Sequence, residues 1–212
     1  RENDKCDYTY FNVPNGPVHL DSKGRLWIMQ EYQPISMIKD LANPHDYIKF
    51  DLRKVDGPRD LTGILEHDDG RVLFSSWSAG IHEYSGSNTF KRYVVSNSFL
   101  SSNKIRFSKR ISDDMVAIAS GDGNLFICSY TDSLVLVKTL NEDNGLHGSN
   151  FLDVEIKGDD FIIWHNGGID IIDYQKMLGS NELRFSLIDN NEGFEVVSGS
   201  LQEESNFSWF LH

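Results

Sequence analysis

The chain has 212 residues, of which 39% are hydrophobic and 25% charged, the proportions of a globular protein that buries a sizeable core. It carries 32 acidic and 20 basic residues, and no stretch gathers Lys and Arg into a basic stripe, so nucleic acid is not an expected partner. No run approaches the 18 apolar residues of a membrane span. We therefore expect a soluble chain, from which a leader or anchor could have been removed.

A short apolar run recurs along the chain at steps of 46, 44, 46 and 46 residues. The runs begin at Arg25, Arg71, Met115, Phe161 and Phe207. Each follows a polar turn rich in Asp, Gly, Ser or Asn, the residues that form tight hairpin turns. A fixed period of this length indicates a repeat architecture in which each unit is one supersecondary element.

Each unit continues with further short strands. In chain order after the first run, we expect strands at 47–52, 81–84, 90–95, 104–107, 125–127, 134–137, 151–156, 169–172 and 183–188. Pro34 interrupts the first unit, so residues 34–40 are interpreted as an insertion or an edge. No stretch of 11 or more residues has a helical period. Four strands per unit predict an all-β fold, a β-propeller of four-stranded blades with a repeat of about 45 residues.

We expect one propeller segment over residues 1–212, divided into blades at 12–60, 61–103, 104–150, 151–193 and a partial unit at 194–212. Trp27, Leu73, Ala117 and Ile163 should occupy equivalent positions in their blades. A strand at 8–11 could close a five-bladed ring, or the chain could form part of a larger ring. The second alternative is favoured because the sequence stops inside an apolar run.

The repeat units carry a family resemblance. Residues 21–27 and 68–84, with the later turns at 145–150 and 167–169, resemble the two-component regulator propeller repeat. The second and third units depart from it in lacking Trp at the expected strand position. Such repeats form the extracytoplasmic sensor regions of bacterial hybrid two-component histidine kinases, many of which detect glycans. The resemblance implies a periplasmic or extracytoplasmic sensor, with the rest of the propeller or a sensor kinase as its protein partner.

Motifs for catalysis are absent from the sequence. It contains no Gly-x-Ser-x-Gly, no Gly-rich phosphate loop before a helix and no His-Glu-x-x-His. The acidic turns lack EF-hand spacing and are interpreted as solvated. We therefore expect no catalytic residue, no cofactor and no metal ion in this segment. A propeller enzyme of the lactonase or glycan-lyase type and a protein-interaction platform are the alternatives, and a homodimer is left open.

A propeller most often binds partners on the face made by the loop after the second strand of each blade and the loop that enters the next blade. The first kind of loop contains Glu31, Trp77, Asp122, His165 and Asn166, and the second contains Asn144 and His147. Trp77 could stack on a sugar ring while the polar side chains bond its hydroxyls. The alternatives are that Trp77 packs between blades and that His165 is a structural hydrogen-bonder. The expected ligand is a neutral or weakly charged carbohydrate, an oligosaccharide or other small molecule.

Overall fold

A computed structural model describes residues 18–29, 35–50, 60–86, 90–180 and 183–189, together with the backbone of residues 201–204 and 207–210. The strand expected at 8–11 and the candidate residue Glu31 lie outside this part of the chain.

The described chain forms four antiparallel sheets of four strands each, in which neighbours in sequence are neighbours in space. The first sheet holds β1 (Val18–Leu20), β2 (Leu26–Ile28), β3 (Ile35–Ile38) and β4 (Tyr47–Phe50); the second holds β5 (Leu61–Glu66), β6 (Val72–Ser76), β7 (Gly80–Tyr84) and β8 (Phe90–Tyr93). The third holds β9 (Ile105–Ser112), β10 (Met115–Ser120), β11 (Leu125–Tyr130) and β12 (Leu134–Leu140); the fourth holds β13 (Phe151–Lys157), β14 (Asp160–His165), β15 (Gly168–Asp173) and β16 (Ser186–Asp189). A two-stranded sheet of β17 (Leu201–Glu204) and β18 (Phe207–Phe210) follows.

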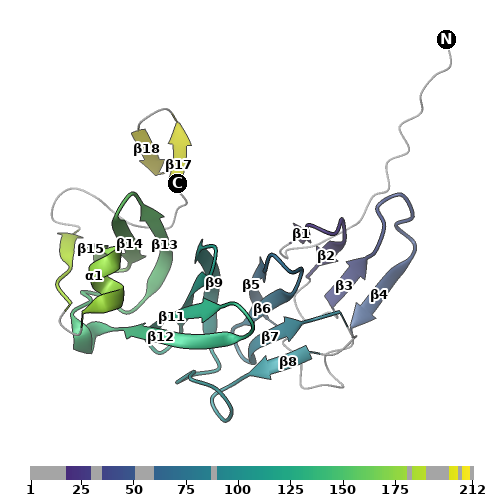
Figure 1. The fold of residues 1–212 in the computed structure, drawn as a ribbon, viewed down its shortest axis with the longest axis horizontal. Coiled ribbons are helices and arrows are strands. Elements are labelled where there is room, and N and C mark those ends of the chain that lie inside the picture. Colours follow the sequence, from purple (N-terminus) through teal and green to yellow (C-terminus); the bar gives the residue numbers. More distant parts are fainter. Residues whose placement is uncertain are drawn as a thin grey trace.

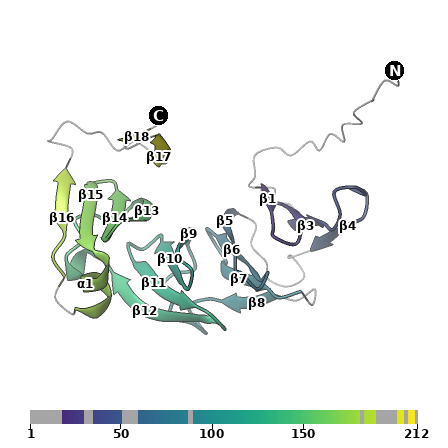
Figure 2. The same ribbon diagram turned by 45° about the horizontal axis from the view of Figure 1, so that its top comes forward.

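The four sheets follow one another along an arc, from the first at the right of Figure 1 to the fourth at the left. The turned view in Figure 2 shows the same succession. The first strands β5, β9 and β13 pack beside one another, so they form the inner edges of their sheets. Successive four-stranded meanders with their first strands gathered together are the blades of a β-propeller, and the predicted fold class is confirmed.

The core lies between the blades in three layers, because both faces of each sheet are apolar. Trp27 of the first blade packs against Phe74 and Tyr84 of the second, with ring centroids 5.3 and 5.0 Å apart. Leu73, the residue next to Phe74, points the other way and joins the layer shared with the third blade. Neighbouring residues of a strand thus serve two different layers, as the alternation of side chains requires.

The strand register confirms the expected equivalence of Trp27, Leu73 and Ala117, which pair with equivalent residues of their first strands. In the fourth blade, however, the equivalent residue is Ile162, and Ile163 faces back toward the third blade. The reason is the length of the first hairpin. In the second blade, five residues lie between the paired Glu66 and Val72. In the fourth blade, four lie between the equivalent pair Ile156 and Phe161, and the hairpin closes one pair later at Lys157 and Asp160. One residue fewer turns each later side chain of the strand to the opposite face.

Two further expectations need correction. Within the range 34–40, which was expected to be an insertion or an edge, residues 35–38 form the inner strand β3, which pairs with β2 on one side and with β4 on the other. The strand begins at Ile35, and Ile35, Met37 and Ile38 are buried. In the fourth blade, the last strand begins at Ser186 instead of residue 183, after a short helix α1 (Tyr174–Gly179) that the periodicity did not predict.

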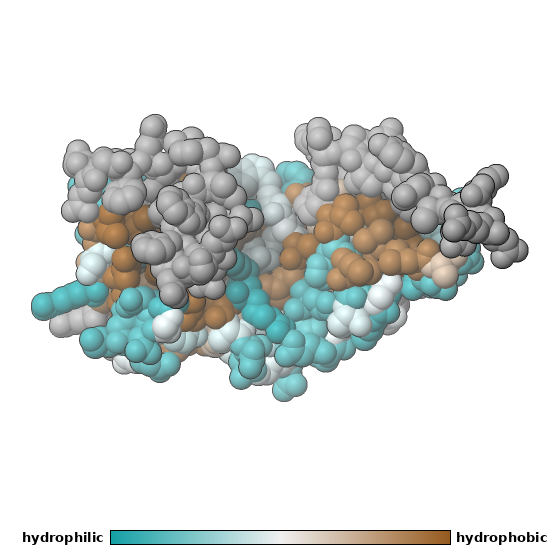
Figure 3. Space-filling view, turned by 90° about the horizontal axis from the view of Figure 1, so that it is seen from above, coloured by the Kyte–Doolittle hydropathy of each residue, from teal (hydrophilic) through white to brown (hydrophobic). Residues whose placement is uncertain are grey.

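The first blade exposes an apolar face. Val18 and Leu20 of β1 are 51% and 55% exposed, and hydrophobic residues form a brown area in the right half of Figure 3, where this blade lies. Val18 pairs with Ile28 as Ile64 pairs with Phe74, yet Ile64 packs against the preceding blade. This exposed face is therefore of the kind that another blade covers in a larger ring.

Candidate functional site

The six candidate residues that the structure describes lie on one end of the second, third and fourth blades. Antiparallel strands reverse direction at each turn, so the turn after the second strand and the connection into the next blade leave a sheet from the same end. Trp77 lies in the β6–β7 turn, Asp122 in the β10–β11 turn, and Asn166 in the β14–β15 turn. His147 lies in the connection that enters the fourth blade. We call this end the loop face.

Trp77 lies at the inner rim of the loop face, where β5 and β9 begin. Its backbone N–H donates to the carbonyl of Asp60, 2.9 Å away, just before β5. Its ring reaches the third blade, where the Arg106 guanidinium carbon and the Lys104 Nζ lie 5.2 and 5.9 Å from the ring centroid. The residue remains 37% exposed. Trp77 thus contacts the neighbouring blade and also offers surface to solvent.

Asp122 is held by donors from the loops around it. Burial raises the pKa of this carboxyl, but hydrogen bonds from Ser101, Ser120 and Asn124 outweigh burial and leave the pKa below its ordinary value. Asn124 in turn donates to Ser101 Oγ at 3.0 Å and accepts from Asn141 Nδ2 at 2.9 Å. The carboxylate is therefore ionised and oriented in advance.

Asn144 has a structural role. It closes a 3₁₀ turn at Glu142–Asn144, in which Asn141 and Asn144 each bond the other's backbone N–H. The amide nitrogen of Asn144 also donates to the carbonyl of Thr139 at 2.7 Å. Both ends of this side chain are engaged within the loop, so Asn144 shapes the loop face.

His147 and His165 meet at a residue that the sequence analysis missed, Asp170 of β15. Asp170 is completely buried and accepts the His147 backbone N–H at 2.8 Å, His147 Nδ1 at 2.6 Å and His165 Nε2 at 3.0 Å. Burial raises the pKa of Asp170, but these hydrogen bonds hold it below its ordinary value. The signal available in the sequence was an acidic residue between Ile169 and Ile171 of an apolar strand, because a buried carboxylate requires partners.

The His165 ring is part of the core of this cluster. Its Nδ1 accepts the Gly167 N–H at 3.0 Å, so the ring proton lies on Nε2 and points to Asp170. A Cβ on Gly148 would lie 2.2 Å from the ring, so a glycine is required there. His165 is fully buried and is a structural hydrogen-bonder, whereas His147 keeps 42% of its side chain exposed.

Asn166 is exposed at the tip of the same turn. Its backbone N–H donates to the carbonyl of Asn150 at 3.1 Å, and its side-chain oxygen accepts the Asn150 N–H at 3.4 Å. Of the six described candidates, Trp77, Asp122, His147 and Asn166 therefore present surface on the loop face, while Asn144 and His165 support it from within.

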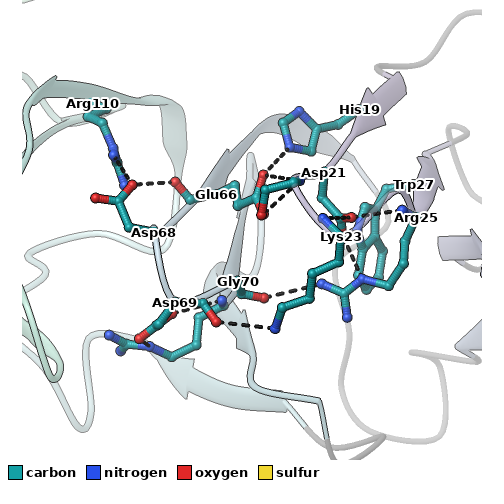
Figure 4. Close-up of polar contacts among 12 residues, drawn as sticks. His19, Asp21, Lys23, Arg25, Trp27, Glu66, Asp68, Asp69, Gly70 and Arg110 are labelled. Carbon is teal, nitrogen blue, oxygen red and sulfur yellow. Dashed lines mark hydrogen bonds and ion pairs between the residues drawn. The ribbon is translucent and has the colours of Figure 1, made fainter.

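A second polar cluster occupies the opposite end of the first two blades (Figure 4). Glu66 accepts the backbone N–H and hydroxyl of Ser22, and Arg25 donates to Asp21 at 2.6 Å and to the carbonyl of Gly70 at 3.2 Å. Arg110 of the third blade continues the pattern with Asp68 at 2.6 Å. The contacts of Glu66 with Ser22, of Arg25 with Gly70 and of Arg110 with Asp68 each cross from one blade to a neighbouring one, so the cluster joins blades.

The fourth blade also carries a groove beside α1. The groove, of about 540 Å³, lies between α1 and the outer strands of the fourth blade, with Asp160, Asp173, Lys176 and Arg184 among its lining residues. Within the described ranges, no three His, Cys, Asp or Glu side chains are placed to hold a metal ion. No helix in that part of the chain is long and apolar enough to cross a membrane.

No protein-family model matches the chain, and no curated protein sequence matches it. Solved structures do match. The extracellular domain of the putative one-component system BT4673 from B. thetaiotaomicron is 16% identical with a TM-score of 0.67, over 91% of this chain and 28% of that chain. The extracellular domain of the putative hybrid two-component system BT3049 from the same organism is 15% identical with a TM-score of 0.59, over 88% and 25%.

A third similar structure is virginiamycin B lyase from Staphylococcus aureus, which is 16% identical with a TM-score of 0.57, over 76% of this chain and 53% of the lyase. The chain spans about a quarter of the length of the two extracellular domains. At these identities the likeness shows the fold, a propeller segment, and leaves the function to be argued from the loop face.

Proposed function

We propose that this chain is part of an extracytoplasmic sensor propeller. It binds an oligosaccharide on the loop face and communicates the binding to a signalling partner such as a kinase. The observation that carries the proposal is the loop face itself, where Trp77, Asp122, His147 and Asn166 from three blades present an aromatic ring and oriented polar groups. The repeat resemblance and the similarity to extracellular domains of one-component and two-component systems support the sensor role.

The loop face suits binding because its polar groups are already ordered. Asp122 is held by three side chains, and Asp170 fixes the loop that carries His147. A preorganised surface loses little conformational entropy on binding, so more of the contact free energy appears as affinity. We propose a non-catalytic role, in which the segment binds its ligand without transforming it.

Isothermal titration calorimetry against a panel of neutral and acidic oligosaccharides tests the proposal. Trp77→Ala should weaken binding by about 1–3 kcal/mol, the order measured for stacking on an aromatic side chain. Tyr47→Ala is the matched control, because Tyr47 is an exposed aromatic on the outer strand of the first blade and also has a lysine, Lys49, over its ring. A thermal melt of each variant shows whether the fold is retained.

The absence of binding across the whole panel would overturn the proposal. Unchanged affinity in a folded Trp77→Ala variant would remove Trp77 from the site and leave it as a contact between blades.

A further inference from the structure

Two basic side chains converge on Trp77 without a carboxylate partner. Lys104 and Arg106 both lie over its ring, and neither forms an ion pair with any carboxylate in the described part of the chain. The Nε of Arg106 is buried and has no hydrogen-bond partner there. Contact with an aromatic face attracts a cation but does not neutralise its charge.

Four other basic residues near the blade contacts do have carboxylate partners. Ion pairs join Arg25 to Asp21 at 2.6 Å, Arg71 to Asp69 at 2.7 Å, Lys109 to Asp153 at 2.9 Å and Arg110 to Asp68 at 2.6 Å. The chain has a net charge of −12, so acidic side chains are plentiful. Lys104 and Arg106 therefore place two positive charges side by side in an acidic chain. They differ from Arg25, Arg71, Lys109 and Arg110, each of which has a carboxylate partner.

Two acidic groups on the loop face, Asp60 and Asp122, are held by other donors. Asp60 accepts hydrogen bonds from the hydroxyls of Ser76 at 3.1 Å and Ser78 at 2.7 Å. Asp122 is held by the donors described above and forms no ion pair with Lys104 or Arg106. Both carboxylates are thus oriented toward neutral donors, and neither forms an ion pair with Lys104 or Arg106.

The backbone holds the cations in place. The Lys104 carbonyl accepts the Gly121 N–H at 2.7 Å and the Ser120 hydroxyl at 3.3 Å. A Cβ on Gly121 would lie 2.9 Å from Lys104 Cβ and 3.3 Å from Trp77 Cη2, so the turn, the lysine and the tryptophan are closely packed. Arg106 follows two residues later on β9, which is an inner strand.

We infer that the ligand of the loop face carries an anionic group, a carboxylate or a sulfate, which binds against Lys104 and Arg106 beside Trp77. The inference rests on the proposed function, and it replaces the neutral or weakly charged carbohydrate expected from the sequence with an acidic oligosaccharide. A guanidinium and an ammonium form strong, charge-assisted hydrogen bonds with such groups, and the aromatic ring contacts the sugar beside them.

Calorimetry with three tetrasaccharides tests the inference and separates the two anionic groups. The probes are a neutral N-acetylglucosamine tetramer, a hyaluronan tetrasaccharide that carries carboxylates, and a chondroitin sulfate tetrasaccharide that carries both carboxylates and sulfates. We expect the acidic probes to bind at least tenfold more tightly than the neutral one at 50 mM NaCl, and to lose most of that preference at 0.5 M NaCl, where exposed charges are screened. A further gain with chondroitin sulfate would identify sulfate as the preferred group.

Substitutions connect the preference to these residues. Lys104→Gln and Arg106→Gln should each weaken binding of the acidic probes about tenfold, the low end for a hydrogen bond to a charged group, and leave the neutral probe unchanged. Arg106→Lys keeps the charge and should restore part of the affinity. Lys49→Gln is the matched control, because it removes the same charge from a lysine over Tyr47, on the outer strand of the first blade.

The results separate this inference from the proposal on which it rests. If neutral oligosaccharides bind as tightly as acidic ones, or if folded Gln variants keep full affinity for the acidic probes, the anionic preference is wrong and the carbohydrate sensor stands. If the chain binds no probe in either this series or the wider panel, both are wrong.

Discussion

Replacing Asp170 by alanine tests whether a buried carboxylate holds the connection into the fourth blade. The variant loses three hydrogen bonds, two from His147 at 2.8 and 2.6 Å and one from His165 at 3.0 Å. A hydrogen bond to a charged group contributes about 1.5–3 kcal/mol, and a buried donor left without a partner costs about 1–3 kcal/mol. Because His147 is partly exposed and recovers water, we expect the free energy of unfolding to fall by about 3–5 kcal/mol rather than by the full sum.

Urea denaturation followed by tryptophan fluorescence measures this loss, and Trp164 next to His165 reports on the same blade. Asp170→Asn keeps the size and one acceptor, so it should cost about 2 kcal/mol. Asp160→Asn is the matched control, because Asp160 is an exposed carboxylate on the adjacent β14. It should change the free energy of unfolding by less than about 0.5 kcal/mol.

The pH dependence provides a second readout. The pKa of Asp170 is lower in the folded chain than in the unfolded one, so its ionised form stabilises the fold above about pH 4. That stabilisation is lost as the pH falls through the pKa of Asp170 in the folded chain. The difference in the free energy of unfolding between the wild type and Asp170→Asn should become smaller in that pH range. A loss below 1 kcal/mol for Asp170→Ala, or a difference that does not change at acidic pH, would refute this role of the carboxylate.

Two further predictions concern the second blade. Gly80→Ala should lower the free energy of unfolding in urea more than Gly24→Ala does. Both glycines have positive φ, but a Cβ on Gly80 would lie 2.3 Å from the Tyr93 carbonyl oxygen, whereas a Cβ on Gly24 would meet nothing within 4 Å. Equal losses in the two variants would contradict this steric reason. Burial, with Arg92 nearby, lowers the pKa of His82 to about 4. Between pH 6.5 and pH 4, His82 is therefore protonated in the unfolded chain and neutral in the folded chain. Stability should therefore fall by up to about 3 kcal/mol between pH 6.5 and pH 4, and His82→Gln should flatten that part of the profile measured by thermal melts; an unchanged slope would show that other groups produce it.

The features of the fold that repeat were predictable from the sequence. The apolar runs, the polar turns between them and the steps of 44 to 46 residues predicted four-stranded blades, and the four sheets have that form. The places where one blade differs from the others were harder to predict. A hairpin one residue shorter in the fourth blade turned Ile163 to the opposite face, and β3 was hidden because Pro34 stands directly before it.

The candidate site shows the same division. The position of Trp77, Asp122 and His147 in loops at one end of the blades followed from strand order alone. Their partners did not, because Lys104 and Arg106 lie about thirty residues from Trp77 in the sequence, and Asp170 is separated from His147 by two strands.

The sequence by itself determined the repeat, the strand class and the end of the blades where the loops gather, because side-chain alternation and turn formation depend on neighbouring residues. Only the tertiary structure decided which side chains of different blades meet. Packing between blades left Lys104 and Arg106 against an aromatic ring instead of a carboxylate, and it buried Asp170 where two histidines could reach it. Such contacts depend on distances across a packed interface, which local sequence patterns do not contain.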